Sequence, residues 1–286
     1  MKAQTTTRMF KFSNPPEPKG VLRTIRTCWL IISFVFFAFQ DSKFTLVKSI
    51  PAFSSFITTD NLGNIYLTKE DILEKYDSEG KFLKNLSNKA LGTISFVDVH
   101  DPLKILLFYK SFQQIVFIDN MLAGSGNFIS LDALGYNQTS LACSSHNNGF
   151  WIYNQQNSEL IRFDQNLQKT QQTGNITQLT GIKLNPDFIT EQNNMLFINN
   201  PESGILVFDI YGTYSKTIPV KGLKRFQISN EQIFYLREGK LKSYNMKTLE
   251  ENEQSLPAND VLDVRTEKEK LYLLKQKSVA IYSATK

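Results

Sequence analysis

Six short hydrophobic segments recur at regular intervals along most of the chain. They begin at residues 65, 105, 150, 195, 233 and 271, so neighbouring starts are 38 to 45 residues apart. Each is rich in β-branched and aromatic residues and is followed by a second hydrophobic segment, which usually ends in an aromatic residue and then Asp or Asn. Such residues favour strands, and the Asn, Asp and Gly residues between the segments favour turns. The spacing therefore indicates one structural unit, of about four strands, repeated six times.

A turn motif supports the repeat. The stretch ILEKYDSEGKFLKNL is echoed later by ILVFDIYGTYSKTI, and Asp77 and Asp209 each follow an aromatic residue. Gly80 and Gly212 stand three residues after these Asp residues. Asp can accept a hydrogen bond from the backbone two residues on, and Gly adopts a positive φ where the chain reverses. We interpret both motifs as turns at the outer edge of a repeat, which removes Asp77 and Glu79 from the candidate functional residues.

The strand pattern predicts an all-β fold. A period near 40 with four strands per unit is typical of β-propeller blades, and no segment after residue 44 has a helical pattern. The last repeat is incomplete because only three residues follow its third strand, whereas residues 44–50 (FTLVKSI) form a strand with no repeat of their own. We therefore predict a six-bladed β-propeller whose ring is closed by the N-terminal strand 44–50, which completes the last blade. Deleting this strand should remove most of the fold.

The first 42 residues differ from the rest. Arg23 and Arg26 precede an uncharged apolar run over residues 28–39. Twelve residues suit the hydrophobic region of a signal peptide and are short of the ~20 needed to span a membrane. We predict that residues 1–42 are a leader with a signal peptide and that residues 43–286 are a single propeller domain. An uncleaved membrane anchor and a buried helix are the alternatives. We expect export to the periplasm or the extracellular space, most consistent with a bacterial envelope.

Charge and cysteine content exclude two classes of protein. The formal net charge is +5, but residues 43–286 hold 26 basic and 25 acidic residues. A near-neutral domain lacks the positive field that binds a phosphate backbone, so we predict no nucleic-acid partner. Cys143 is the only thiol of the predicted mature chain, so no disulfide can form within it. Its apolar neighbours Leu141 and Ala142 favour a buried, inert thiol over a nucleophile. We expect a monomer.

The repeats resemble those of NHL-type six-bladed propellers, within the wider group that includes the TolB-type propeller and the gluconolactonase-like enzymes. The resemblance covers nearly all of residues 44–286 and rests on turn residues and apolar strands. Two repeats depart from it, since Pro102 replaces the usual Asn-Gly turn in the second and the fifth is shortened. For the gluconolactonase-like enzymes, the resemblance implies a central divalent ion, such as Ca²⁺, held by Glu, Asn and Asp side chains from several blades.

Candidate site residues follow from aligning the innermost strands. Counting eight residues back from each recurring segment gives Ile57, Val97, Ala142, Asp187, Arg225 and Asp263. Inner strands converge on the axis of a propeller, so we predict that Asp187, Arg225 and Asp263 meet at the channel mouth. Asp98, Gln227 and Arg265 would extend this polar lining. An Arg between two carboxylates indicates an ion-pair network and not a cation site. The network is either a structural clamp or a binding site for a small anion or a peptide terminus. We predict no metal and no cofactor.

No catalytic set can be assigned from spacing. His100 and His146 lie in predicted turns without zinc-ligand spacing, and we interpret them as solvated turn residues. The absence of a Ser-His-Asp arrangement favours an exported, non-enzymatic binding or scaffold propeller that recognises a protein or peptide partner with one rim of the ring. The alternative is a channel-mouth hydrolase or lyase of the gluconolactonase-like, metal-dependent kind. A third is a structural module of a larger surface complex.

Overall fold

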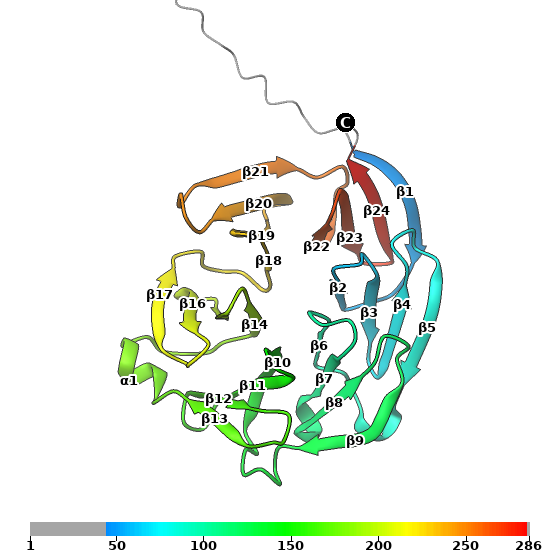
Figure 1. Ribbon diagram of the computed structural model, residues 1–286. Coiled ribbons are helices and arrows are strands. Elements are labelled where there is room, and N and C mark those ends of the chain that lie inside the picture. The colour runs from blue at the N-terminus through cyan, green and yellow to red at the C-terminus, as the bar shows by residue number, and fades with distance from the viewer. Residues whose placement is uncertain (1–43, 285–286) are drawn as a thin grey trace, which may run out of the picture. The chain divides into compact units, whose positions relative to one another are not determined.

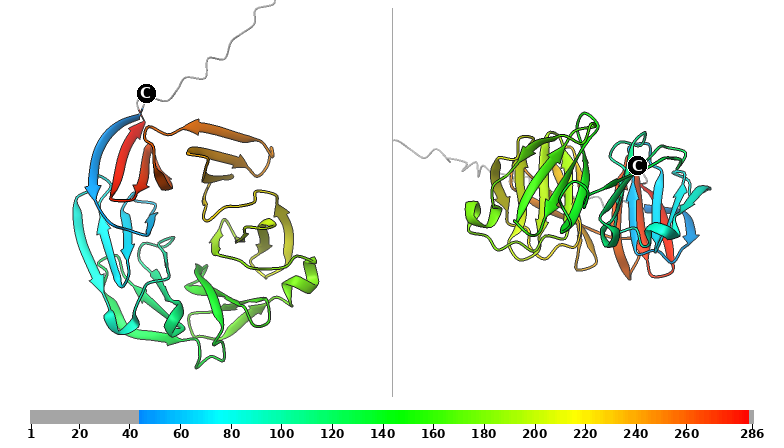
Figure 2. Two further views of the ribbon diagram at one scale, coloured as in Figure 1. Left: turned by 180° about the vertical axis from the view of Figure 1, so that it is seen from behind. Right: turned by 90° about the horizontal axis from the view of Figure 1, so that it is seen from below.

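The chain folds into six antiparallel sheets of four strands each, arranged as blades around a central channel (Figure 1). The computed structural model describes residues 44–284, apart from the side chains of residues 125–127. The predicted leader at residues 1–42 lies outside the described residues. Figure 2 shows the ring from behind and edge-on, with the sheets standing side by side. The prediction of an all-β, six-bladed β-propeller is confirmed.

Each blade runs from an inner to an outer strand in chain order, except at the ring closure. Blade one holds β2 (Phe56–Thr59), β3 (Ile65–Lys69), β4 (Ile72–Tyr76) and β5 (Phe82–Ser87), and blade two holds β6 (Phe96–Asp98), β7 (Ile105–Tyr109), β8 (Gln114–Ile118) and β9 (Gly124–Ser130). Blade three holds β10 (Thr139–Ser145), β11 (Gly149–Asn154), β12 (Glu159–Phe163) and β13 (Lys169–Gln172), and blade four holds β14 (Phe188–Gln192), β15 (Met195–Asn200), β16 (Gly204–Asp209) and β17 (Tyr214–Ile218). Blade five holds β18 (Gln227–Ser229), β19 (Gln232–Arg237), β20 (Lys240–Asn245) and β21 (Glu251–Ser255), and blade six holds β22 (Val261–Glu267), β23 (Lys270–Lys275), β24 (Ser278–Ala284) and β1 (Phe44–Pro51).

Among residues 44–284, helical structure is confined to short connections. The helix α1 (Ile176–Thr180) follows blade three, and two 3₁₀ turns span Lys89–Leu91 and Lys110–Phe112. The sequence pattern predicts no helix, but Asn175 caps α1 by accepting a hydrogen bond from the Gln178 backbone, and Gly181 ends it at φ 70°. Among residues 44–284, no helix is long and apolar enough to cross a membrane.

The N-terminal strand closes the ring. β1 pairs antiparallel with β24 from Phe44↔Ala284 to Pro51↔Ser278, and the two strands lie side by side in Figure 1. Blade six therefore joins the first and last described strands, which confirms the predicted closure. Gly80 of blade one packs directly on this seam, because a Cβ at Gly80 would lie 2.8 Å from Ile281 and 3.2 Å from Ile50.

The turn after the third strand repeats around the ring. The Oδ1 atom of Asp77 accepts hydrogen bonds from the backbone N–H groups of Glu79 and Lys81, at 2.9 and 2.8 Å. The equivalent residues that make the same pair of bonds are Asp119, Asp164 and Asp209. The interpretation of Asp77 as a turn former is confirmed, and the device is present in four blades.

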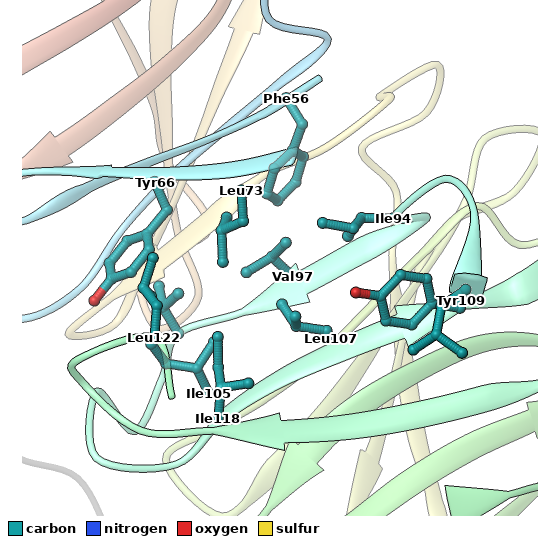
Figure 3. Packing of buried hydrophobic residues seen from close by; sticks show 12 residues of the cluster. Phe56, Tyr66, Leu73, Ile94, Val97, Ile105, Leu107, Tyr109, Ile118 and Leu122 are labelled. Atoms are coloured by element: carbon teal, nitrogen blue, oxygen red, sulfur yellow. The ribbon is translucent and has the colours of Figure 1, made fainter. Parts of the chain in front are cut away.

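The hydrophobic core lies between neighbouring blades. The second strands of blades one to three are almost fully buried, since β7, β11 and all but the last residue of β3 consist of buried residues. Figure 3 shows the cluster between blades one and two, where Val97 and Leu107 of blade two face Phe56 and Leu73 of blade one. Each fully buried side chain of this kind stabilises the fold by ~1.5–3 kcal/mol relative to exposure. The recurring segments of the sequence are thus the strands that hold adjacent blades together.

Four phenylalanine rings pack against one another in the central channel. Phe56, Phe96, Phe188 and Phe226 come from blades one, two, four and five, and lie at or next to the starts of the inner strands. Successive ring centroids are 5.9, 5.6 and 4.9 Å apart, in edge-to-face arrangements. Blade three contributes the small side chain of Ala142, which is fully buried in a cluster that also contacts Phe96. We call these four rings the aromatic plug.

Candidate functional site

A cavity of about 570 Å³ lies at the turns between the first and second strands of blades two, three and four. Both histidines of the described chain line it. We call it the His146 cavity, and its other lining residues are Asn61, Asp101, Pro102, Lys104, Phe117, Ser144, Ser145, Asn147, Asn148, Gly149, Glu191, Gln192, Asn193, Asn194 and His100.

A second cavity, of about 950 Å³, lies at the opposite ends of the inner strands, where those of blades four, five and six begin. We call it the Arg225 cavity. Its lining residues are Ser54, Ser55, Asp187, Gly222, Lys224, Arg225, Leu236, Arg237, Glu238, Gly239, Val261, Leu262, Asp263 and Leu274. Three of the six residues predicted to line the channel mouth, Asp187, Arg225 and Asp263, therefore line one cavity.

The predicted Asp-Arg-Asp network is only partly formed. Nη1 of Arg225 lies 3.7 Å from Oδ2 of Asp263, and Nη2 of Arg265 lies 3.8 Å from the same oxygen. Both distances exceed hydrogen-bonding length, so this oxygen is buried without a hydrogen-bond donor among the described residues. Asp187 instead accepts a hydrogen bond from Nδ2 of Asn199 at 2.6 Å, and burial raises the pKa of its carboxyl group.

The Arg225 guanidinium lies over the ring of Phe56, 4.3 Å from the ring centroid. It makes no hydrogen bond with any residue that the structure describes, and its side chain is 30% exposed. A guanidinium carries five N–H donors, so its hydrogen-bonding capacity is directed at the cavity and at solvent.

The other three predicted residues lie elsewhere. Arg265 is buried and donates hydrogen bonds from Nε to the Ile57 carbonyl at 3.2 Å and from Nη1 to the Phe226 carbonyl at 3.0 Å, which ties together blades one, five and six. Asp98 accepts hydrogen bonds from the backbone N–H groups of His100 and Ser144, both at 2.9 Å. The side-chain amide of Gln227 donates a hydrogen bond to the Thr266 carbonyl at 2.7 Å and accepts one from the Thr266 N–H at 2.9 Å. All three residues line a separate cavity of about 220 Å³ beyond the aromatic plug.

The strand register shows where the alignment of the inner strands by sequence was right and where it was displaced. In blades one to three, the count of eight residues matches the observed pairs Ile57↔Leu67, Val97↔Leu107 and Ala142↔Ile152. In blades four and six, the equivalent residues are Thr190, opposite Phe197, and Val264, opposite Leu273. The alignment was wrong for blade four because its turn holds only two residues between β14 and β15. The count therefore reached three residues too far, to Asp187.

The donor set of the Arg225 cavity does not suit a divalent cation. The guanidinium groups of Arg225 and Arg265 already face Asp263, and the Asp187 carboxylate accepts a hydrogen bond from the side-chain amide of Asn199. No three or more His, Cys, Asp or Glu side chains in the described part of the chain gather in a way that could hold a metal ion.

Glu191 organises one wall of the His146 cavity. Its Oε1 accepts hydrogen bonds from the backbone N–H and from Nδ1 of His146, both at 3.0 Å. Its Oε2 accepts hydrogen bonds from Oγ of Ser145 at 2.6 Å and from Nε1 of Trp151 at 2.7 Å. Burial opposes ionisation of this carboxyl group, but the four donors outweigh it and lower the pKa of Glu191. Arg162 supports the turn by donating to Ser145 Oγ at 2.8 Å and to the His146 carbonyl at 2.6 Å.

The interpretation of His146 as a turn residue is confirmed, but the expectation of a solvated ring was wrong. Its side chain is 28% exposed, and its ring is bonded to a buried carboxylate on the next blade. Glu191 is 45 residues away in sequence, so no local spacing could reveal the pair. The weak signal was a glutamate near the end of an inner strand, followed by the Asn-Asn turn. His100 is exposed, and its ring makes no hydrogen bond with any described residue.

Cys143 is fully buried, as predicted, and burial raises the pKa of its thiol. A buried thiol in its neutral form is a poor nucleophile. We therefore leave Cys143 out of both candidate sites.

No protein-family model and no curated protein matches the sequence. Solved structures are similar to it, among them the WD40 domain of Pan2 from Neurospora crassa, with a TM-score of 0.63 and 10% identity over 86% of this chain and 97% of that one. A streptogramin B lyase has a TM-score of 0.57 and 12% identity over 85% and 98% of the two chains. BamB from Moraxella catarrhalis has a TM-score of 0.51 and 10% identity over 84% and 100%. At such low identity the likeness shows the propeller fold alone.

Proposed function

We propose that the propeller is a binding module that recognises a terminal carboxylate of a protein or peptide partner in the Arg225 cavity. The supporting observation is the Arg225 guanidinium, which lines the cavity without a hydrogen bond to any described residue. The planar fork of a guanidinium matches the two oxygens of a carboxylate. Stacking on Phe56 holds that plane in place before the ligand arrives, which reduces the entropy lost on binding.

Asp263 favours a peptide terminus over a bare anion. It lines the same cavity as Arg225, and its Oδ2 lies 3.7 Å from Nη1 of Arg225. A chain terminus offers a carboxylate and, within the same residue, a backbone N–H. The carboxylate pairs with Arg225, and the N–H group is a donor of the kind that suits a neighbouring acidic side chain, whereas a bare anion would only be repelled by it. Lys224 adds a second positive charge to the same wall.

The cellular setting belongs to this proposal. We propose that residues 1–42 are a leader that directs export to the periplasm or extracellular space of a bacterial cell, and that membrane contact is made only through a leader that stays uncleaved. The exported chain would act as a monomer and without a cofactor. It would have no nucleic-acid partner, because the charge of residues 43–286 is nearly balanced.

The partner is identified by pull-down from the native cell envelope with the purified protein as bait. We expect Arg225→Gln to lose the captured partner. The matched control is Arg237→Gln, because Arg237 lines the same cavity but already donates to the Lys221 carbonyl.

Calorimetry with a peptide from the partner's C-terminus, as free acid and as amide, then tests the carboxylate. Equal binding of both peptides, or capture by Arg225→Gln, would contradict the proposal. If Arg225→Gln and Asp187→Ala lower only the melting temperature, these residues form a structural clamp.

The alternative, a metal-dependent hydrolase or lyase at the same channel mouth, finds no matching donor set there. It is tested by the melting temperature of the protein with added Ca²⁺ or Zn²⁺. A specific site would raise this temperature as the ion concentration increases, and an unchanged temperature would count against the alternative.

A further inference from the structure

The two ring nitrogens of His146 have different surroundings. Nδ1 lies 3.0 Å from Oε1 of Glu191, and Nε2 has no hydrogen-bond partner among the described residues. The ring lines the His146 cavity. Glu191 belongs to blade four and His146 to the turn after β10 in blade three, so the pair bridges two blades.

The contacts of Glu191 set the tautomer of this ring. An ionised carboxylate only accepts hydrogen bonds, and Glu191 receives donors from Ser145, from Trp151 and from the His146 backbone. The proton of a neutral His146 ring therefore resides on Nδ1. Nε2 then carries the lone pair, and it is the ring atom left for the cavity.

Ser145 is not the nucleophile of a Ser-His-Glu triad. In such a triad the serine lies on the Nε2 side of the ring, whereas Ser145 Oγ lies 3.3 Å from Nδ1. Its proton is donated to Glu191, and its oxygen accepts a hydrogen bond from Arg162. With Ser145 excluded as the nucleophile, water is a molecule that the free Nε2 can activate.

We propose that His146, positioned by Glu191, is the general base of a hydrolase site for small carboxylic esters in the His146 cavity. Nε2 takes a proton from water as the water oxygen bonds to the ester carbonyl carbon. The tetrahedral intermediate collapses with cleavage of the bond between the carbonyl carbon and the alcohol oxygen, and the imidazolium returns the proton to that oxygen. This inference goes beyond the proposed binding function and does not rest on it, because the two cavities share no lining residue.

Lys104 supplies positive charge for the intermediate. Its ammonium group lines the cavity, lies 4.2 Å from the centroid of the Phe117 ring and donates one hydrogen bond to the Asn148 carbonyl at 2.7 Å. An ammonium has three donors, so two stay available for an oxyanion. One base and one cation suit esters, whose alkoxide leaving group needs a single proton.

The test is hydrolysis of p-nitrophenyl acetate by the full chain. We expect His146→Gln to lower kcat/KM by about 100-fold, the loss typical for removal of a general base. The matched control His100→Gln removes the other imidazole of the cavity and should lose far less activity than His146→Gln, because the His100 ring makes no hydrogen bond with a described residue. A wild-type rate for His146→Gln, or an equal loss for His100→Gln, would overturn the proposal.

The positioning role of Glu191 has its own readout. We expect kcat/KM to fall in Glu191→Gln, because the carboxylate that orients the His146 ring is lost, and to return partly towards wild type in Glu191→Asp, which keeps a carboxylate. If Glu191→Gln does not fold, ¹⁵N NMR of the wild-type imidazole decides the point. A neutral ring with its proton on Nε2, or a wild-type kcat/KM in Glu191→Gln, would overturn this role.

Discussion

The ring of Phe96 in blade two packs edge to face against the ring of Phe188 in blade four, with 5.6 Å between their centroids. These blades are not neighbours, so the contact spans the inner edge of blade three, within the central channel. Phe56 and Phe226 extend the contact to blades one and five. The aromatic plug therefore links four blades through one chain of ring contacts within the channel.

Phe96→Ala should destabilise the whole ring, because Phe96 packs against the hydrophobic clusters of several blades. We expect the free energy of unfolding to fall by about 3 kcal/mol, the low end for loss of a large aromatic side chain. Urea denaturation measures the change. Phe128→Ala is the control, because Phe128 is 56% exposed and its loss should change stability by less than about 0.5 kcal/mol. Equal losses in both variants would show that the plug carries no stability.

The blades could be predicted from sequence because their signals are local. A buried second strand needs a run of apolar residues, and a turn needs Asp, Asn or Gly, so both leave a pattern within a few residues. The Asp-x-x-Gly form of the turn marks only blades one and four. In blades two and three, Leu122 and Leu167 take the position of the Gly, at φ 55° and 61°. Both side chains pack against a hydrophobic cluster, so the same turn forms there without the Gly that marks it in the sequence.

The sites could be predicted less well because they depend on long-range register. A difference of a few residues in one turn displaced the predicted partner of Arg225, and the His146–Glu191 pair joins different blades. Pairing across blades depends on how sheets pack, which no local spacing encodes. Arg265 illustrates the limit, since its side chain reaches the carbonyl of Ile57, 208 residues away.

Gly80 should be sensitive to a single methyl group. It has φ 76°, and a Cβ there would lie 2.8 Å from Ile281 at the ring closure. Gly135 has a similar φ of 87° but nothing within 4 Å of such a Cβ. Gly135→Ala should cost about 1 kcal/mol for backbone conformation alone, and Gly80→Ala should cost clearly more. Thermal denaturation compares the two. If both variants lose the same stability, the packing of Gly80 against β1 and β24 contributes nothing.

Arg265 should be a structural residue and not a ligand-binding one. Arg265→Met would leave two buried carbonyl groups, those of Ile57 and Phe226, without their donor. We expect a loss of about 2–4 kcal/mol in the free energy of unfolding, measured by chemical denaturation. Arg225→Met is the comparison, because Arg225 donates no hydrogen bond to a described residue, and it should cost much less. A larger loss for Arg225→Met would reverse the roles assigned to the two arginines.

Glu191 should make stability depend on acid pH. Its pKa is lower in the folded chain than its ordinary value, so the unfolded chain binds more protons in the interval between the two values. The stability from the four hydrogen bonds is therefore fully present above about pH 4.5 and is lost as pH falls through the lowered pKa. Glu191→Gln lacks this ionisation, so we expect the stability difference from wild type to shrink from pH 6 to pH 3. Urea titrations at these pH values measure it, with the exposed Glu202→Gln as control. A wild-type curve parallel to that of Glu191→Gln would mean that the four donors bind a carboxyl group whose ionisation does not matter to the fold.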